Sequence, residues 1–268
     1  ELDQSFTHRF IVRYNKTNTK KNRVLIVFLN GQAQQNYVGQ HTIRLNRDTT
    51  LVGGYELPVG SQFSFPVNLD GYFVGRAFVS TGKLIEKLKL NVNVDASLDF
   101  RRQPGLINNI LNFSNNTTYG LGVVLSSNIS EKIDFTLSSR TTANQVINSV
   151  QSSQNTNFIQ QNSLARLNVI FKKGTVFRST LNHQLYSGLS DAFNQNFWLW
   201  SIAIAQKFGK KQQAEIQLSV FDALRQNTSI QRTVTENYIE DLQTLVLQRY
   251  AMLTFTYNLR NFKDGMND

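Results

Sequence analysis

The 268-residue sequence predicts an all-β fold, an antiparallel transmembrane β-barrel with about 11–12 strands present that form part of a larger barrel. Three observations predict this fold. Apolar and polar residues alternate with period two in many segments, as they do along strands. No predicted helix or second apolar layer covers the apolar faces of these strands. Short and long connections alternate between them, as in outer-membrane barrels.

Composition limits the alternatives without choosing between them. Charged residues make up 17% of the chain and aromatic residues 11%, and the mean hydropathy is -0.31. These values suit a soluble all-β protein and also a barrel with a polar lumen. The longest apolar run, 24–29, is too short for a transmembrane helix. Cysteine is absent, which excludes disulfides, thiol nucleophiles and thiolate metal sites.

The formal net charge is +10, which raises the question of nucleic-acid binding. Such binding calls for a basic patch interleaved with aromatic residues. Here Lys and Arg are scattered, with small clusters in turns. We therefore expect no nucleic-acid partner, and the charge favours attraction to the phosphate-bearing headgroups of lipids. The polar, acidic residues 1–4 predict that residue 1 is a mature or truncated start.

Eleven strands are predicted from the alternation. The segment 88–101 alternates strictly over fourteen residues. At about 3.3 Å per residue, a tilted strand of this length can cross a bilayer. A bend is expected at Pro66 and at Asp70-Gly71, and 36–60 has no assignment. The predicted strands are about 5–15, 23–35, 62–80, 88–101, 117–128, 133–138, 158–171, 175–185, 195–208, 213–220 and 244–262.

The connections differ in length in a regular way. Short ones are predicted near residues 16, 84, 130, 173 and 210, and long ones near 48, 109, 148, 190 and 233. In outer-membrane barrels the short turns are periplasmic and the strand number is even. An odd count of eleven therefore predicts the C-terminal portion of a larger barrel. A twelfth strand within 36–60 would instead complete a twelve-stranded pore. A secreted sandwich or jelly roll is the structural alternative.

Several stretches resemble a known family: 68–72 (NLDGY), 104–109 (PGLINN), 125–139 (LSSNISEKIDFTLSS), 181–197 (LNHQLYSGLSDAFNQNF), 218–241 and 246–262 (VLQRYAMLTFTYNLRNF). They are similar to the C-terminal barrel of TonB-dependent-receptor-like outer-membrane proteins of Bacteroidetes-type bacteria. The resemblance implies a barrel of about 22 strands closed by an N-terminal plug. It also implies residence in the bacterial outer membrane. No plug domain is recognised in 1–268, so all of it is assigned to the barrel.

The polar faces of the predicted strands hold the candidate functional residues. One interpretation is a hydrated lumen that binds or passes a solute, and the other is a solvated wall whose charges pair across strands. The lumen-facing candidates are Lys89, Asn91, Asp95, Asp99, Arg101, Arg178, Gln184, Glu215, Gln248 and Arg260. Aromatic residues predicted for the membrane interface, or for ordinary packing, are Trp198, Trp200, Tyr250, Phe255 and Tyr257.

No residue pattern predicts an enzyme, a metal or a cofactor. His8, His41 and His183 lie in separate segments without ligand spacing. Gly120 and Gly122 do not form a nucleotide-binding loop, since no helix follows them, and they are interpreted as relieving crowding inside the barrel.

The sequence thus predicts a receptor barrel that moves or binds a solute. Its partners would be outer-membrane lipid and a TonB-type energising system acting through a plug. The alternative is a non-transport barrel, a structural or secretion-associated subunit with an envelope protein partner.

Overall fold

The structure is a computed structural model that describes residues 1–50, 54–127, 130, 132–150, 152–189, 194–209, 212–234 and 239–259, with the backbone alone for 230–232, 234 and 239. The described chain is all-β. A sheet of 13 strands dominates it, accompanied by two ribbons of two strands. Its helical elements are 3-10 turns of three residues. None of the described helices is long and apolar enough to cross a membrane.

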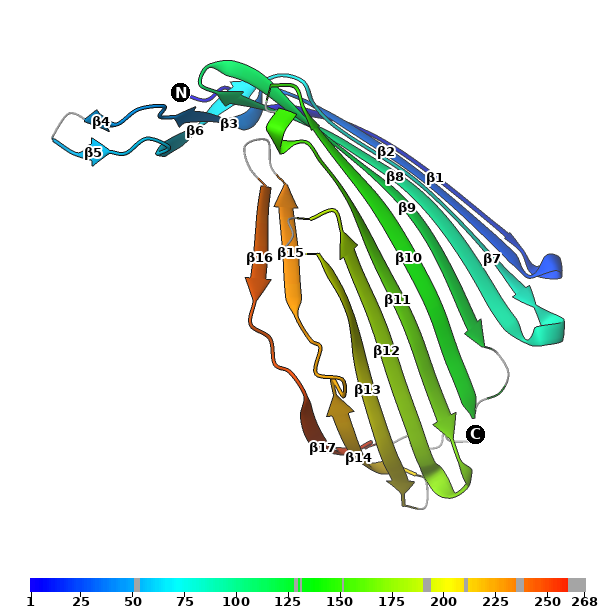
Figure 1. Cartoon of the computed structure of the whole chain (residues 1–268). Helices are drawn as coiled ribbons and strands as arrows, with labels where there is room; N and C mark the ends of the chain where they lie inside the picture. The colour runs from blue at the N-terminus through cyan, green and yellow to red at the C-terminus, as the bar shows by residue number, and fades with distance from the viewer. Residues whose placement is uncertain are drawn as a thin grey trace.

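Eleven strands form the continuous path of the sheet, and each pairs antiparallel with the next. Figure 1 shows a curved, open sheet with β1 at one edge and β17 at the other. In order, the path runs through β1 (Phe6–Asn18), β2 (Arg23–Gln35), β7 (Tyr72–Ile85), β8 (Leu90–Ile107), β9 (Ile110–Ser127), β10 (Ile133–Asn148), β11 (Thr156–Ile170), β12 (Thr175–Ser187), β13 (Gln195–Phe208), β14 (Ala214–Phe221) and β17 (Tyr250–Tyr257).

Short turns join the strands at one end of the sheet, which we call the turn end. The turns η1 (Thr19–Lys21), η2 (Glu86–Leu88) and η4 (Lys172–Gly174) are single 3-10 turns. η1 and η2 are each followed by a residue in the left-handed region, Asn22 and Lys89, at φ 47° and 48°. The backbone can therefore reverse within a few residues, and the predicted short connections there are confirmed.

The opposite end, called the loop end, differs from the prediction. β8 and β9 continue past the expected loop at 103–115 and meet in a two-residue turn at Asn108 and Asn109, both at positive φ. β10 likewise extends to Asn148, and η3 (Ser152–Gln154) precedes β11. Between β14 and β17 the hairpin of β15 (Ser229–Val234) and β16 (Ile239–Thr244) replaces the expected loop.

The segment 36–60, for which the sequence predicts no element, contains one strand of a bent hairpin. β3 (Tyr37–Arg44) continues from β2 and pairs with β6 (Gln62–Leu69), which leads into β7. The bend falls at Asn36, where φ is 50°, and at Asp70-Gly71, whose carboxylate accepts from the Asn36 N–H at 3.0 Å. The expected bend at Asp70-Gly71 is confirmed. Pro66 causes no break, because it pairs with Gln40 inside the ribbon.

The bent hairpin packs over the loop end, where four of the five largest fully buried side chains lie. β3 touches β8 through a short parallel pairing at His41 and Thr42. Fully buried side chains gather in this region, and Gly39 lies so close to the Pro104 carbonyl that a Cβ would stand 2.9 Å from it. The part of the bent hairpin farthest from the large sheet is the small ribbon of β4 (Thr49–Thr50) and β5 (Glu56–Leu57). Buried residues of this core include Thr42, Pro104, Ile107, Asn112 and Val146.

The last strand is shorter than predicted. The alternation was expected over 244–262, but Thr244 ends β16 and β17 begins only at Tyr250. Leu245 and Leu247 lie in the connection between the two strands and are exposed. The part of the prediction beyond Leu259 lies outside the described residues.

Candidate functional site

The two faces of the sheet differ in chemistry, and the register fixes which residue lies on which. On β8 the even positions from Leu90 to Phe100 are apolar, and the odd positions include Asn91, Asp95 and Asp99. Register partners share a face, so the division continues from strand to strand along β8 to β14. On β2 and β7 the face that holds Asp99 also carries apolar residues, namely Val24, Ile26, Phe28, Val74 and Phe78. Leu98 aligns with Tyr119, and Asp99 aligns with Thr118. We call the two sides the apolar face and the polar face.

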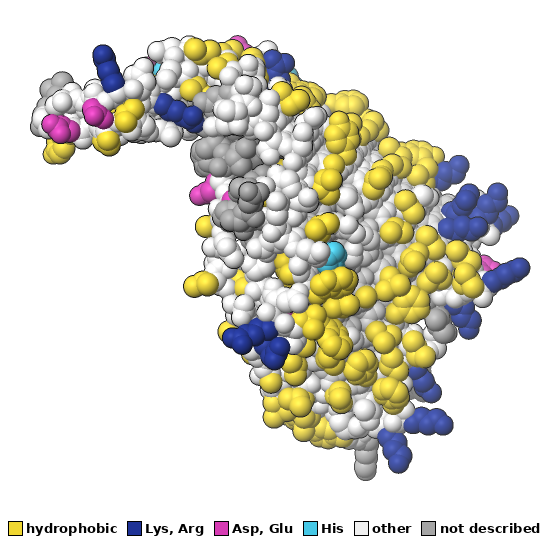
Figure 2. Space-filling view, in the orientation of Figure 1, with side chains coloured by type: hydrophobic (Ala, Val, Ile, Leu, Met, Phe, Trp, Pro, Cys, Tyr) yellow, Lys and Arg dark blue, Asp and Glu magenta, His cyan; other side chains and the backbone are white. Residues whose placement is uncertain are grey.

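No described element packs on the apolar face. Its large side chains stay exposed, with exposed fractions of 67% for Leu121, 59% for Ile204 and 72% for Leu253. Figure 2 shows hydrophobic side chains spread over the broad side of the sheet, with a row of Lys and Arg along its turn end and others on the projecting hairpin and at the opposite edge. Exposed apolar area on this scale is rare on soluble monomers and marks an interaction surface.

The apolar band has the length of a membrane-crossing strand. On β8 it runs from Leu90 to Phe100, eleven residues, or roughly 33 Å along the strand. A tilted strand needs about 9–11 residues to cross the hydrocarbon core. Lys89 at the turn end and Arg102 at the loop end bound this band with positive charges.

The polar face carries an ion-pair cluster at its centre. Arg140 on β10 reaches across β9 to β8, where one guanidinium nitrogen contacts the Asp95 carboxylate and the other donates to the Ser97 hydroxyl at 2.9 Å. The side chains are partly shielded, with 40% of Arg140 and 20% of Asp95 exposed. The pair therefore lies at the surface of the sheet and cross-links alternate strands.

Two glycines on β9 make this crossing possible. A Cβ at Gly120 would stand 2.7 Å from Nη2 of Arg140, and one at Gly122 would collide with the Asp95 carboxylate. Any side chain at either position would thus occupy the space of the ion pair. The two glycines thus relieve crowding on the polar face of the sheet, and the expectation that this face is the inside of a barrel stays a prediction.

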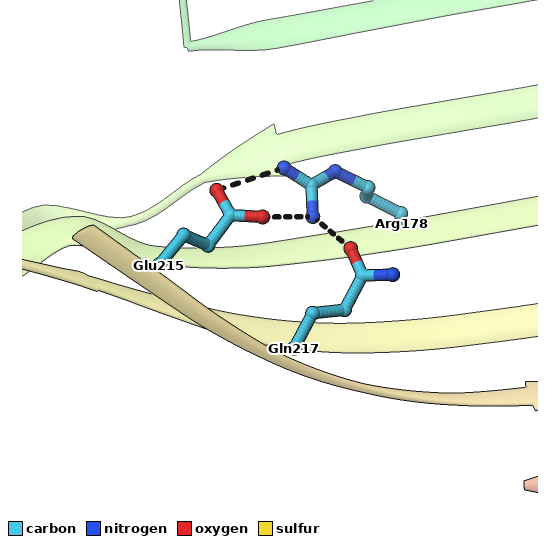
Figure 3. Close-up of polar contacts among 3 residues, drawn as sticks. All are labelled: Arg178, Glu215 and Gln217. Carbon is cyan, nitrogen blue, oxygen red and sulfur yellow. Dashed lines mark hydrogen bonds and ion pairs between the residues drawn. The ribbon is translucent and has the colours of Figure 1, made fainter. Parts of the chain in front are cut away.

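A second cluster of the same design lies nearer the turn end. Arg178 on β12 reaches across β13 to β14, and its two nitrogens bind both carboxylate oxygens of Glu215, at 2.9 and 3.2 Å. Figure 3 shows the guanidinium between Glu215 and Gln217, whose amide oxygen also accepts from it. The intervening strand again supplies small residues, since Ala203 pairs with Arg178 and Ala205 with Gln217, and both alanines are buried.

The remaining polar-face candidates divide into three groups. Asp99 pairs with Arg76 at 3.2 Å, and Asn91, Arg101 and Gln184 share its face by register. Lys89 lies in the turn after η2, and Gln248 lies in the connection before β17. Arg260 lies outside the described residues. The structure thus brings together a central set of predicted lumen residues, whereas Lys89 and Gln248 lie at opposite ends of the sheet.

Two hollows are relevant to binding. One, of about 450 Å³, lies on the polar face beside the central ion pair and is lined by Asp95, Arg140, Gln160, Asn162, Gln184 and Tyr186. A larger one, of about 950 Å³, lies at the loop end and is rich in amides, including Asn196, Gln226, Asn227, Gln243 and Gln248. Both offer hydrogen-bond donors and acceptors of the kind that bind polar solutes.

The aromatic candidates lie on both faces. On the apolar face, Trp198 and Trp200 lie toward the loop end, whereas Phe255 and Tyr257 lie toward the turn end of β17. The Trp200 indole donates to the Ser179 hydroxyl at 3.0 Å. Tyr250 is on the polar face, where it stacks on Phe221 with ring centroids 4.6 Å apart.

The histidines stay apart from one another. His8 is exposed on β1, His41 is buried against Phe65, and His183 stacks on Trp198 with its Nε2 2.6 Å from the Asn196 amide oxygen. Within the described ranges, no group of three His, Cys, Asp or Glu side chains could hold a metal ion.

Sequence reasoning missed Arg140 and Arg76, the partners of Asp95 and Asp99. The sequence predicts a strand that ends at 138, so Arg140 falls in the predicted connection after it. A signal was present: Asp134, Thr136, Ser138 and Arg140 continue one polar alternation on β10.

Comparison with protein-family models, with curated proteins and with solved structures gave no match for this chain. The fold and the site therefore carry the functional argument.

Proposed function

We propose that this chain forms part of the wall of a transmembrane β-barrel in the bacterial outer membrane, and that the barrel belongs to a TonB-dependent-receptor-like protein that binds or passes a solute. The observation that carries the proposal is the pair of unlike faces. An uncovered apolar face and a hydrogen-bonded polar face extend together from β8 to β14. Lipid on one side and a hydrated lumen on the other would satisfy both faces.

The directions of the strands support an incomplete barrel. Because eleven strands alternate in direction along the path, β1 and β17 run the same way. Direct closure would join them in parallel, whereas bacterial barrels of this kind are antiparallel. An odd number of further strands would close the sheet in the antiparallel manner. A second copy inserted in the same orientation would again set parallel neighbours at both seams.

Closure is a physical requirement of the proposal. The outer edges of β1 and β17 present unpaired N–H and C=O groups, and in hydrocarbon each such group costs several kcal/mol. The missing strands would come from more of the same polypeptide or from another subunit. The first source suits a receptor barrel with a plug.

A specific observation favours the second candidate, a structural or secretion-associated barrel subunit. Three polar-face carboxylates, Asp95, Asp99 and Glu215, are already bound by arginines of the same sheet. A wall whose charges neutralise one another gives stability without a ligand. On this reading the polar face is a scaffold and the function lies with a partner.

Isolation of the native protein from its membrane distinguishes the two candidate functions. A receptor should be a polypeptide well above 30.6 kDa that contains a plug, and its uptake of solute should stop when the TonB system is removed. A structural subunit should copurify with a fixed envelope protein, and loss of the TonB system should leave its function intact. Recovery in the soluble fraction would contradict both.

A further inference from the structure

The ten lysines that the structure describes all belong to one end of the sheet. The first two short turns and their flanks carry Lys16, Lys20, Lys21, Lys83, Lys87 and Lys89. The next turns and their flanks carry Lys132, Lys172, Lys173 and Lys207. We call these ten residues the lysine belt. The other three lysines of the sequence, at 210, 211 and 263, lie outside the described residues.

The loop end has a different charge balance. Its connections contain no lysine in the sequence, and its cations are arginines such as Arg47, Arg225 and Arg249. Carboxylates accompany them, among them Asp48, Glu56 and Asp222. The positive charge of the molecule is therefore polarised along the strand direction, and Figure 2 shows the cations along the turn end.

The lysine belt has few anionic partners of its own. The ion pairs between described residues lie on the polar face of the strands and include no belt lysine. Within the turns, Glu86 accepts a hydrogen bond from the Asn22 amide at 2.6 Å. On the flanks, Asp134 accepts from the Ser127 hydroxyl, and Glu215, the register partner of Lys207, is bound by Arg178. Arg23 and Lys83 are direct register partners, so two positive charges stand opposite each other. Like charges in this position repel unless an anion lies between them.

The belt also meets the margin of the apolar face. By register, Lys16 and Lys83 share a face with Phe10 and Val79, and all belt lysines except the half-buried Lys207 are exposed. A lysine beside an apolar band can lay its methylene stem along the hydrocarbon and place its ammonium among the headgroups. The belt therefore stands at the depth where phosphate groups would lie.

We propose that the lysine belt binds the phosphate groups of anionic glycerophospholipids in the leaflet at the turn end. The inference rests on the proposed location in a membrane, and it adds a lipid preference and an orientation to that location. Each lysine near an anionic leaflet strengthens association by about fivefold at low salt. The effect falls within a Debye length, so high salt should remove it.

The test uses the full protein reconstituted in bilayers that contain spin-labelled phosphatidylglycerol or phosphatidylcholine. Electron spin resonance then reports which lipid is held at the protein surface. The variant Lys20→Gln/Lys21→Gln/Lys87→Gln removes three charges from the turn end. The control Arg47→Gln/Arg225→Gln/Arg249→Gln removes the same charge from the loop end.

The wild type should favour phosphatidylglycerol severalfold, and about 1 M NaCl should abolish the preference. The lysine variant, which keeps seven of the ten belt lysines, should lose a measurable part of it, and the arginine control should keep it in full. Equal selectivity in the two variants would overturn the lysine belt while leaving the membrane location intact. No motionally restricted lipid of either kind would instead refute the location. Tight binding of a single-stranded oligonucleotide without lipid selectivity would also overturn the inference, in favour of nucleic acid.

Discussion

At the scale of single residues, charged pairs on the polar face depend on the small residues beneath them. Arg140 reaches Asp95 across Gly122, and Arg178 reaches Glu215 across a strand with buried alanines. Both pairs tie together strands that share no backbone hydrogen bonds. Side-chain ion pairs on the polar face therefore connect strands in addition to the backbone hydrogen bonds of the sheet.

Gly122→Val should break the central link. The new side chain would collide with the Asp95 carboxylate, so Arg140 and Asp95 must separate. Overpacking of this kind costs about 1–3 kcal/mol. The free energy of unfolding in lipid vesicles checks it, with Gly31→Val as the control, because a Cβ at Gly31 meets nothing within 4 Å. Equal losses in the two variants would contradict the role given to Gly122.

Side chains on the two faces of β17 should respond differently to charge. Leu253→Arg or Phe255→Arg places a cation on the apolar face, where it costs about 2 to 4 kcal/mol at the bilayer midplane. Thr254→Arg places the same charge on the polar face and should cost far less. The yield of folded protein in vesicles measures the difference, and similar yields would refute the assignment of faces.

At the scale of elements, turn chemistry sets where each strand ends. The β8–β9 turn needs positive φ at both Asn108 and Asn109, at 47° and 65°. Asn108 is also held by its contacts, since its side chain accepts from the Arg44 N–H at 2.7 Å. Asn109 has the conformational role alone, so it is the cleaner position to change.

Asn109→Gly should hold or slightly raise the free energy of unfolding, because glycine takes a left-handed conformation freely. Asn109→Val should lower it by about 1–2 kcal/mol, since a β-branched residue is strained there. Urea unfolding in vesicles distinguishes the two. A valine variant as stable as the glycine variant would mean that the turn is not tight.

Prediction from sequence worked where alternation alone decides structure. The eleven path strands and the turns after Asn18 and Ile85 follow from period two and polar breaks. The sequence-based prediction is wrong at Pro104, which falls in the predicted connection between 101 and 117 but lies within β8. β7 pairs with β8 only as far as Arg102, so β8 has no β7 partner at Pro104 and its missing N–H costs nothing there. Strand pairing of this kind depends on residues distant in sequence.

The sequence predicts some residues of the candidate site but not how they pair. Asp95 and Glu215 stand out in clean alternation, but their partners Arg140 and Arg178 are 45 and 37 residues away. Which arginine meets which carboxylate depends on register and on the small residues between them. Neither is visible in a local pattern.

At the scale of the whole molecule, polar groups and charges are distributed over three regions of the sheet. The apolar face holds a band of membrane-crossing length, the polar face holds three ion pairs between described residues, and the turn end holds the lysine belt. Polar side chains also interrupt the apolar face, among them Thr141, Ser179 and His183. Three others bond to one another: Ser139 and Ser163 lie 3.0 Å apart, and Gln161 donates to both at 3.3 Å. In the proposed barrel these mutual hydrogen bonds would reduce the cost of facing hydrocarbon.

The central claim is that one face of the sheet meets lipid and the other meets water. The chain has no cysteine, so Leu121→Cys on the apolar face and Thr142→Cys on the polar face each introduce one thiol. In intact membranes a water-soluble maleimide should label Thr142→Cys and leave Leu121→Cys unlabelled, because a thiol in hydrocarbon is not reached by the reagent and is not ionised to the reactive thiolate. After unfolding, the same reagent should label both variants. Labelling of Leu121→Cys by the water-soluble reagent in intact membranes would contradict the account.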